Sequence, residues 1–294
     1  MKILLLGSDG YLGSKLKKEL KNKNFELYSV DINPKDNETI KLDVTNSGEI
    51  DKYLKNENFD IIISLIGVLP GVFPKNTLYN KNISSVSYLK NIKCESHFIF
   101  ASSTAVYSND SNLMSATENP FEIYGQSKLD SENLIKNFVD SFTILRIGTI
   151  ISKDRKGGIM ALLKRFREGK LIWIPKNGEV VHPFIHVNDV VKAFIYICEN
   201  INKSNGKTYD IVSQKRDSFN QIAQNLNYNP RIIGNKFLDF LISKIGSDNL
   251  PILGISKWHF NALKYNLKTS NNNNSWNYFS FMSTTDAIQK SLED

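Results

Sequence analysis

Hydrophobic and polar positions follow two different periods along the first half of the chain. Short runs rich in β-branched and aromatic residues predict strands at residues 2–6, 25–30, 40–42, 60–65, 97–102 and 142–147. Between these runs, apolar residues recur at three- and four-residue spacing, which predicts helices at residues 11–20, 50–55, 78–92 and 124–139. Because strands that alternate with helices are typical of βαβ units, we expect an α/β fold, a doubly wound parallel sheet with helices on both faces.

The alternation loosens after Ile147. Here the pattern predicts a helix at residues 159–167, a strand at 171–174, a helix at 190–199 and a last strand of the sheet at 209–212. The remaining residues include a polar stretch at 270–275 with four consecutive asparagines, which we expect to be an exposed loop.

Composition restricts the class of protein. The chain has 294 residues, of which 41% are hydrophobic, enough for a real core, so we do not expect a disordered or fibrous protein. The apolar start of the chain is interrupted by Ser8, Asp9 and Gly10, which does not fit a secretion signal, and the longest apolar stretch, residues 61–73, is too short to span a bilayer. We therefore expect a soluble cytoplasmic protein with no membrane partner.

Cysteine, histidine and charge add three further expectations. Cys94 and Cys198 lie in apolar periodic segments, so we expect buried, reduced thiols. The histidines form no HExxH motif, and Pro183 prevents a helical pairing of His182 with His186, so we expect no metal. The net charge of +7 suits an anionic partner, but no compact basic run with interleaved aromatic residues occurs, which argues against nucleic acid.

The first predicted strand runs directly into the segment GSDGYLG, which places Gly7, Gly10 and Gly13 between a strand and a helix. Glycines at this spacing let the backbone turn sharply and approach a pyrophosphate, while the start of the helix offers free N–H groups. Glycine also occurs in such turns for conformational reasons alone. A second feature is therefore needed to distinguish a dinucleotide site from an ordinary turn.

Asp31 supplies that second feature. It ends the second predicted strand about twenty residues after the glycines, where a carboxylate can accept hydrogen bonds from an adenosine ribose. The same charge repels a 2′-phosphate, so we expect NAD, although Lys35 is near enough in the sequence to leave NADP open. An aspartate in this place can also simply start a turn.

A catalytic group is predicted around the segment YGQSK. Tyr124 and Lys128 lie there at the start of a helix, and their four-residue spacing puts both on one face. A tyrosine pKa of about 10 makes a weak base at neutral pH, so we expect Lys128, together with the positive nicotinamide ring of an oxidised cofactor, to favour the phenolate. Tyr124 could then take or return a hydroxyl proton while a hydride moves. Ser103 ends the strand at 97–102, at the edge where open α/β sheets bind ligands, and would orient the reacting oxygen.

In these segments the sequence resembles the extended short-chain dehydrogenases, the NAD-dependent epimerase/dehydratase family that acts on nucleotide sugars. GSDGYLG is similar to the family's GxxGxxG, SSTAVY to its serine motif and YGQSK to its YxxxK. The resemblance covers most of the chain and implies catalytic roles for Ser103, Tyr124 and Lys128. It implies a cofactor site formed by Gly7, Gly10, Tyr11, Leu12, Gly13, Asp31, Asp43 and Val44 of LDVT, Asn82 of NKNIS, Tyr124 and Lys128.

A long segment at residues 177–194, NGEVVHPFIHVNDVVKAF, closely resembles the family signature GxGxxxRxFIHVxDVAxA. His182 stands where the family often has an arginine near the substrate diphosphate, so neutral hydrogen bonds, His182 itself or a basic group such as Arg155 would have to bind the phosphates. The resemblance thus implies a substrate site that includes Ser103, Thr104, Arg155 and His182.

The resemblance also implies a division of the chain into two parts. Residues 1–150 and 185–213 would form the NAD(P)-binding Rossmann domain, and residues 151–184 and 214–294 a smaller, irregular substrate-binding subdomain. The family's pairing of two helices implies a homodimer through residues 78–92 and 124–139.

The residues after Ser103 reduce the number of reaction types that the family resemblance allows. Thr104 and Ala105 stand where the family's dehydratases carry an Asp-Glu pair and its decarboxylases a glutamate. Without those acids we expect an NAD(P)-dependent nucleotide-sugar 4-epimerase or, alternatively, an NAD(P)H-dependent 4-keto-sugar reductase, and Asp31 favours the epimerase. A third alternative is a non-catalytic Rossmann protein that senses cofactor or binds nucleic acid, which the basic charge supports. Such proteins typically lose the tyrosine and lysine that this chain retains.

Overall fold

The fold was analysed in a computed structural model of the whole chain. The structure describes residues 1–55, 57–70, 72–90, 95–107, 117–120, 122–155, 158–173, 178–233, 249–250, 255–256 and 276–293. Cys94, His259 and the predicted loop at 270–275 lie outside these residues. None of the described helices is long and apolar enough to cross a membrane.

The centre of the molecule is a seven-stranded sheet in which all neighbouring strands are parallel. Its order is β10-β6-β5-β4-β1-β2-β3. The strands are β1 (Lys2–Leu6), β2 (Glu26–Asp31), β3 (Thr39–Lys41), β4 (Ile61–Ser64), β5 (His97–Ser103), β6 (Phe142–Ile147) and β10 (Lys207–Ile211). This confirms the predicted fold class, and each strand lies within two residues of its expected position.

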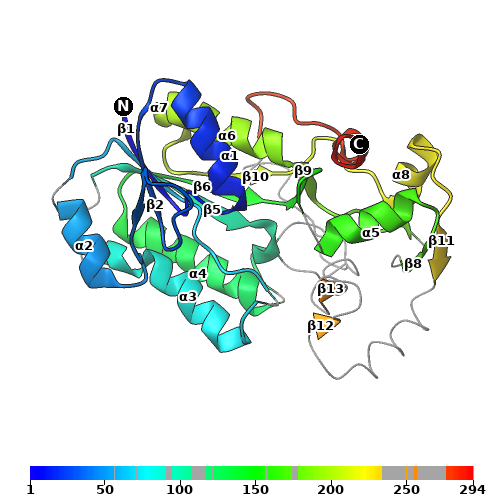
Figure 1. The fold of residues 1–294 in the computed structure, drawn as a ribbon, viewed down its shortest axis with the longest axis horizontal. Coiled ribbons are helices and arrows are strands. Elements are labelled where there is room, and N and C mark those ends of the chain that lie inside the picture. The colour runs from blue at the N-terminus through cyan, green and yellow to red at the C-terminus, as the bar shows by residue number, and fades with distance from the viewer. Residues whose placement is uncertain are drawn as a thin grey trace.

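Helices cover both faces of this sheet (Figure 1). One face carries α1 (Tyr11–Asn22), α6 (Val187–Glu199) and α7 (Ile201–Ser204), and the other carries α2 (Ser47–Lys55), α3 (Lys75–Ser87) and α4 (Ile123–Phe138). Two short 3-10 helices, η1 (Tyr88–Lys90) and η2 (Thr104–Val106), follow α3 and β5. The predicted helix at 78–92 therefore begins three residues earlier and changes to a 3-10 turn after Ser87.

Alternate residues of β1 show why helices must pack on both faces of the sheet. Ile3 and Leu5 belong to a core shared with α1 and α6, whereas Leu4 and Leu6 belong to a core shared with α2, α3 and α4. All four side chains are fully buried. A strand buried on both faces must be apolar at every position, which is the continuous run that the sequence displays.

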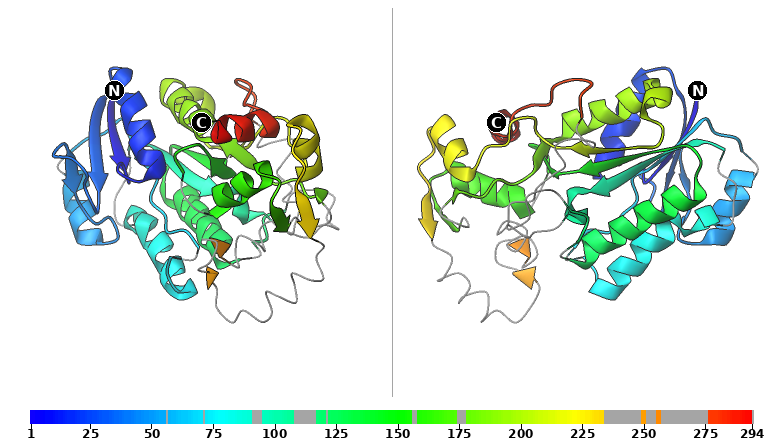
Figure 2. Two further views of the ribbon diagram at one scale, coloured as in Figure 1. Left: turned by 45° about the vertical axis from the view of Figure 1, so that its right-hand side comes forward. Right: turned by 180° about the vertical axis from the view of Figure 1, so that it is seen from behind.

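A smaller part of the molecule lies beside the sheet (Figure 2). It contains α5 (Gly158–Arg167), α8 (Phe219–Asn225) and α11 (Thr284–Leu292), together with the short pairs β8 (Leu171–Trp173) with β11 (Arg231–Ile233) and β12 (Asn249–Leu250) with β13 (Ile255–Ser256). Two further strands, β7 (Thr149–Ile151) and β9 (Phe184–His186), pair in parallel. The hydrophobic pattern predicts neither β7 nor β9.

The smaller part has a hydrophobic core of its own. This core combines residues from β7, α5, β9, α8 and α11, including Phe166, Phe184, Phe219 and Ile288. The segment 276–281 behaves differently, because Phe281 packs in the core of the sheet with α6. The division of the chain at residues 150, 185 and 213 stays a prediction. The core of the sheet and the core of the smaller part are compatible with this division, except that segment 276–281 contributes to the core of the sheet.

Candidate active site

The turn between β1 and α1 has the geometry of an anion cradle. Gly7 has a φ of 79°, and a Cβ on Gly13 would lie 2.1 Å from the carbonyl oxygen of Gly7, so the helix can approach the turn this closely only with glycine there. Gly10 caps the start of α1, which has no side-chain cap and no acidic residue in its first turn. The N–H groups and the positive end of this helix are therefore available to a pyrophosphate. The residues present fit a dinucleotide.

Asp31 ends β2 beside this turn. Its carboxylate accepts hydrogen bonds from the backbone N–H of Asp9 (3.0 Å) and of Asn33 (2.9 Å). Each oxygen keeps a second lone pair for a hydroxyl group, because a carboxylate can accept about four hydrogen bonds. The predicted ribose-binding residue is therefore held in place from both sides.

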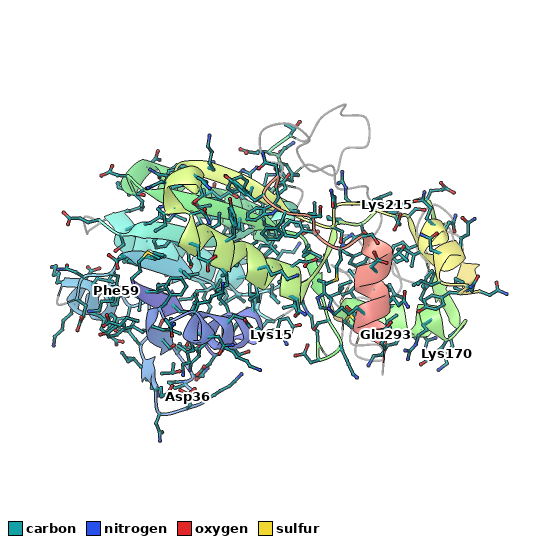
Figure 3. The ribbon with its side chains drawn as sticks, turned by 90° about the horizontal axis from the view of Figure 1, so that it is seen from above. Lys15, Asp36, Phe59, Lys170, Lys215 and Glu293 are labelled. Carbon is teal, nitrogen blue, oxygen red and sulfur yellow. The ribbon has the colours of Figure 1, made fainter. Side chains whose placement is uncertain are left out.

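The loop after β2 is fixed to the glycine turn through Asp9. This carboxylate is 6% exposed and accepts a hydrogen bond from the backbone N–H of Lys35 at 2.6 Å. The side chain of Lys35 donates to the carbonyl oxygen of Asp9, also at 2.6 Å. Lys17 of α1 is buried and pairs with Asp36 at 2.6 Å. Figure 3 shows Asp36 on this loop. The hydrogen bonds from Lys17 and Thr39 hold the pKa of Asp36 at about 2.

Three further residues expected at the cofactor are held in place by burial or by hydrogen bonds within the protein. Val44 is buried in the core between the sheet and α2 to α4. Asp43 accepts hydrogen bonds from Thr45, at 2.9 Å from the backbone and 2.7 Å from the hydroxyl. Asn82 is buried, accepts from the backbone N–H of Val68 at 2.7 Å and donates to the hydroxyl of Ser127 at 2.9 Å. Asn82 thus holds the stretch after β4 against α4.

Ser103 lies at the carboxyl end of β5, as expected, and its hydroxyl accepts a hydrogen bond from the backbone N–H of Ala105 at 3.2 Å. It also forms a side-chain hydrogen bond with Tyr124. Thr104 is buried at the start of η2. The close packing of η2 on α4 depends on Gly125, because a Cβ there would lie 2.0 Å from the carbonyl oxygen of Ala105.

Lys128 lies one turn along α4 from Tyr124, and both residues are buried. Its ammonium group donates to the carbonyl oxygens of Ala101 (2.9 Å) and Ile66 (3.3 Å), at the ends of β5 and β4. Ile66 also touches the glycine turn, since a Cβ on Gly7 would lie 3.3 Å from its side chain. Lys128 and the glycine turn, which are far apart in the sequence, therefore both lie against Ile66.

The electrostatics differ from the sequence expectation in one respect. Burial raises the pKa of Tyr124, while its hydrogen bond with Ser103 and the charge of Arg155 act to lower it. Burial lowers the pKa of Lys128 to about 8, against the opposing effect of the Glu132 charge. The predicted lowering of the tyrosine pKa by Lys128 is therefore not found between these two groups. The cation that acts on the phenol is Arg155.

Two comparisons with known proteins bear on this site. The NAD dependent epimerase/dehydratase family matches residues 3–211, which include the glycine turn, Asp31, Ser103, Tyr124 and Lys128. The chain belongs to this family. The chain is also 26% identical to Protein CapI of Staphylococcus aureus over 229 residues, which are 66% of this chain and 68% of CapI.

Solved structures of other epimerase-like proteins share the fold. A UDP-glucose 4-epimerase of Thermotoga maritima, solved with UDP-glucose, is 16% identical, with a TM-score of 0.63 over 98% of this chain and 92% of that one. A GalE-like L-threonine dehydrogenase of Cupriavidus necator, in its holo form, is 17% identical, with a TM-score of 0.72 over 99% of each chain. At such low identity these likenesses show the fold alone, and they confirm the predicted Rossmann-type sheet.

Two of the expected substrate residues, Arg155 and His182, lie against β7. Arg155 donates to the carbonyl oxygen of Ile150 at 2.6 Å, and its guanidinium lies 5.4 Å from the centre of the Tyr11 ring. His182 is 4% exposed, and its Nε2 is 2.7 Å from the hydroxyl of Thr149. His182 is thus fixed between β7 and β9.

The sequence did not point to two further residues of this region, Ser152 and Asp154. The hydroxyl of Tyr11 is hydrogen bonded to the hydroxyl of Ser152 and to the carboxylate of Asp154, the latter at 3.3 Å. Lys15 pairs with Asp154 at 2.5 Å. Figure 3 shows Lys15 at the end of α1 nearest the smaller part of the molecule. No motif marks Ser152 or Asp154, because each acts through a partner about 140 residues away.

Proposed function

We propose that this protein is an NAD-dependent nucleotide-sugar epimerase, acting at carbon 4 by hydride transfer at a sugar carbinol. The observation that carries the proposal is the convergence of Ser103, Tyr124 and Lys128 at the end of β5, adjacent to the glycine turn. A bound dinucleotide supplies the hydride acceptor and donor. The family match and the likeness to an epimerase solved with UDP-glucose support the substrate class.

Each residue of the candidate site would have its own role in this reaction. Tyr124 exchanges the proton of the reacting hydroxyl, and the hydroxyl of Ser103, already bonded to Tyr124, orients that oxygen. Lys128 contributes positive charge between the glycine turn and the phenol. The positive charge of Arg155 favours the phenolate of Tyr124. With Thr104 and His182, Arg155 would line the substrate side.

Two observations support NAD over NADP. Asp31 presents a carboxylate at the end of β2, and the ammonium group of Lys35 is engaged with the carbonyl oxygen of Asp9. A surface cavity of about 500 Å³ beside these residues would take the adenosine end; its walls are Ile32, Asn33, Pro34, Lys35, Asp36, Asn37 and Lys41. A 2′-phosphate here would face Asp31 and would have to draw Lys35 away from Asp9.

The test is turnover of UDP-sugars by the purified protein, with L-threonine as a comparison substrate. An epimerase converts the sugar without net change in free cofactor, whereas stoichiometric cofactor consumption or release would indicate a reductase or dehydrogenase. We expect Tyr124→Phe to lower kcat by about 10²–10⁴-fold, because it removes the acid–base hydroxyl. The matched control is Tyr28→Phe, which removes a hydroxyl bonded to Glu26 on the surface of β2.

Two outcomes would contradict the proposal. Full activity of Tyr124→Phe would exclude this mechanism, and undiminished biological activity without turnover would favour a non-catalytic cofactor sensor. We also expect a homodimer through residues 78–92 and 124–139. Light scattering should then give roughly twice the chain mass of 33.5 kDa, and a mass equal to that of one chain would exclude the dimer.

A further inference from the structure

The face of α4 that packs on the sheet is unusually polar. Its buried residues include Tyr124, Ser127, Lys128, Ser131 and Glu132. Tyr124 and Lys128 belong to the proposed chemistry, and Ser127 holds Asn82. Glu132 has no place in the reaction, yet its side chain is fully buried. A carboxylate in the interior destabilises the fold by several kcal/mol unless it is well paired, so its partners are informative.

Glu132 joins α4 to the ends of two strands. Arg146 of β6 binds both of its oxygens, with Nε to Oε1 at 3.0 Å and Nη2 to Oε2 at 2.6 Å. Ser102 of β5 donates its hydroxyl to Oε1 at 2.5 Å. Ser102 directly precedes Ser103 in the chain. A single carboxylate therefore fixes the helix that carries Tyr124 and Lys128 to the strand that carries Ser103.

Arg146 extends this network beyond the helix. It is fully buried and donates to the hydroxyl of Tyr107 at 3.0 Å, and this hydroxyl donates to Asp210 of β10 at 2.7 Å. Its Nη2 also pairs with Glu118 at 2.5 Å. Burial alone would lower the pKa of Arg146, but the hydrogen bonds and charge of Glu132 outweigh that effect and the pKa is raised. The guanidinium thus stays charged in the interior.

Glu132 also acts on Lys128 through its charge. The two residues are four apart on one helix face, and within the part of the chain that the structure describes Lys128 donates to two neutral acceptors, the carbonyl oxygens of Ala101 and Ile66. Its ammonium group lies 4.6 Å from the centre of the Phe100 ring. Among the described residues, Glu132 is the anion that opposes the effect of burial on Lys128.

We propose that Glu132 is a positioning residue: it locks α4 onto the ends of β5 and β6 through Ser102 and Arg146, and its negative charge acts on the ammonium group of Lys128, four residues away on the same helix face. The role in catalysis rests on the proposed function. The effect of Glu132 on Lys128 does not rest on the proposed function, because it depends only on the geometry of α4 and the two strands.

The first test separates charge from structure. Glu132→Gln alone would leave the buried Arg146 with only the partly exposed Glu118 as an anionic partner among the described residues, and could unfold the protein. The better variant is the double substitution Glu132→Leu with Arg146→Met, since apolar groups of similar volume often replace a buried ion pair without loss of stability. We expect NMR titration of lysine labelled with ¹³C at Cε to give a midpoint for Lys128 of about 8 in the wild type and a lower midpoint in the double variant than in Arg146→Met alone, since these two variants differ only at residue 132. The Lys128 signal is identified by its loss in Lys128→Met.

The matched control for this titration is Lys136→Met. Lys136 is the partly exposed partner of Glu132, 3.6 Å from Oε2, and its removal leaves Glu132, Arg146 and Ser102 in place. We expect an unchanged midpoint for Lys128 in this control. A midpoint in the folded double variant no lower than that in Arg146→Met would overturn the electrostatic half of the proposal.

The second test addresses position. Glu132→Asp keeps the charge but shortens the side chain by one methylene, so the carboxylate can no longer reach Ser102 and both nitrogens of Arg146. We expect kcat to fall at least about tenfold with KM little changed, because small displacements of catalytic groups reduce rates strongly. A wild-type kcat would overturn the positioning half. If the wild type turns over no UDP-sugar, the proposed function has failed, whereas the Lys128 titration still decides the inference.

Discussion

His97, the first residue of β5, illustrates how burial and hydrogen bonds fix one protonation state of a side chain. Its Nδ1 is 2.8 Å from the hydroxyl of Ser141, and its Nε2 is 2.9 Å from the hydroxyl of Thr143. The Thr143 hydroxyl donates its proton to the carbonyl oxygen of Ser204, so Nε2 must donate to Thr143 and Nδ1 accepts from Ser141. Burial lowers the pKa of His97 from 6.5 to about 4.

This lowered pKa predicts a loss of stability in acid. Between pH 6.5 and pH 4 the unfolded chain binds a proton at His97 and the folded chain does not, so the free energy of unfolding falls as the pH falls through this range. The contribution is at most about 3.5 kcal/mol, since one pKa unit corresponds to about 1.4 kcal/mol. We expect urea unfolding of His97→Gln to show a shallower fall than the wild type. Equal slopes in the two proteins would contradict this.

Asp31 supports a prediction about cofactor choice. Its replacement by asparagine removes the negative charge but keeps an oxygen that can accept from the backbone of Asp9 or Asn33. Because a hydrogen bond to a charged group contributes about 1.5–3 kcal/mol, we expect the Kd for NAD to rise about 10- to 100-fold and the preference over NADP to shrink. Titration calorimetry with both dinucleotides measures this. Wild-type protein that binds NADP as tightly as NAD would refute the role of Asp31.

At the scale of elements, the site depends on how closely α4 approaches η2. Gly125 lies in the first turn of α4, between Tyr124 and Lys128, and makes this approach possible. Tyr124 could be expected on the same helix face as Lys128 from the spacing alone. The distance between this face and Ser103 could not, because it is set by backbone contact between two elements.

Gly125→Ala should therefore inactivate the protein while leaving its secondary structure in place. A Cβ 2.0 Å from the carbonyl oxygen of Ala105 must move α4 away from η2 and separate Tyr124 from Ser103. We expect kcat to fall at least about 100-fold, as misplacement by about 1 Å can do, and stability to fall by about 1–3 kcal/mol. Gly48→Ala in α2 is the control, because its Cβ would make only an ordinary contact. Full activity of Gly125→Ala would show that the site tolerates the displacement.

At the scale of the whole molecule, the segment after β7 links the two parts of the protein. Tyr11 of the dinucleotide turn is hydrogen bonded to Ser152 and Asp154, and Arg155 interacts electrostatically with both Tyr11 and Tyr124. The segment thus reaches from the start of α1 to Tyr124. Loss of this link should affect cofactor binding more than folding.

Tyr11→Phe tests this link. It removes the hydroxyl bonds but keeps the exposed pair of Lys15 with Asp154, which contributes little. We expect the Kd for NAD to rise several-fold, because the first turn of α1 loses its support, and the free energy of unfolding to change by no more than about 1.5 kcal/mol. The same measurements on Tyr28→Phe should match the wild type. An unchanged Kd in Tyr11→Phe would show that the link does not serve the cofactor.

The sequence by itself determined the strands of the sheet, its parallel helix-covered architecture and the positions of Gly7, Gly13, Ser103, Tyr124 and Lys128. These features depend on local period and spacing, which a linear chain carries directly. It did not indicate that Phe281 would pack in the core of the sheet.

Only the tertiary structure decided which charges act on which groups. It placed Arg155 rather than Lys128 as the cation that acts on Tyr124, bound Lys128 to carbonyl oxygens, and buried Glu132 against Arg146. The physical reason is that Coulomb interactions depend on distance and burial, and both are set by contacts between residues far apart in the chain.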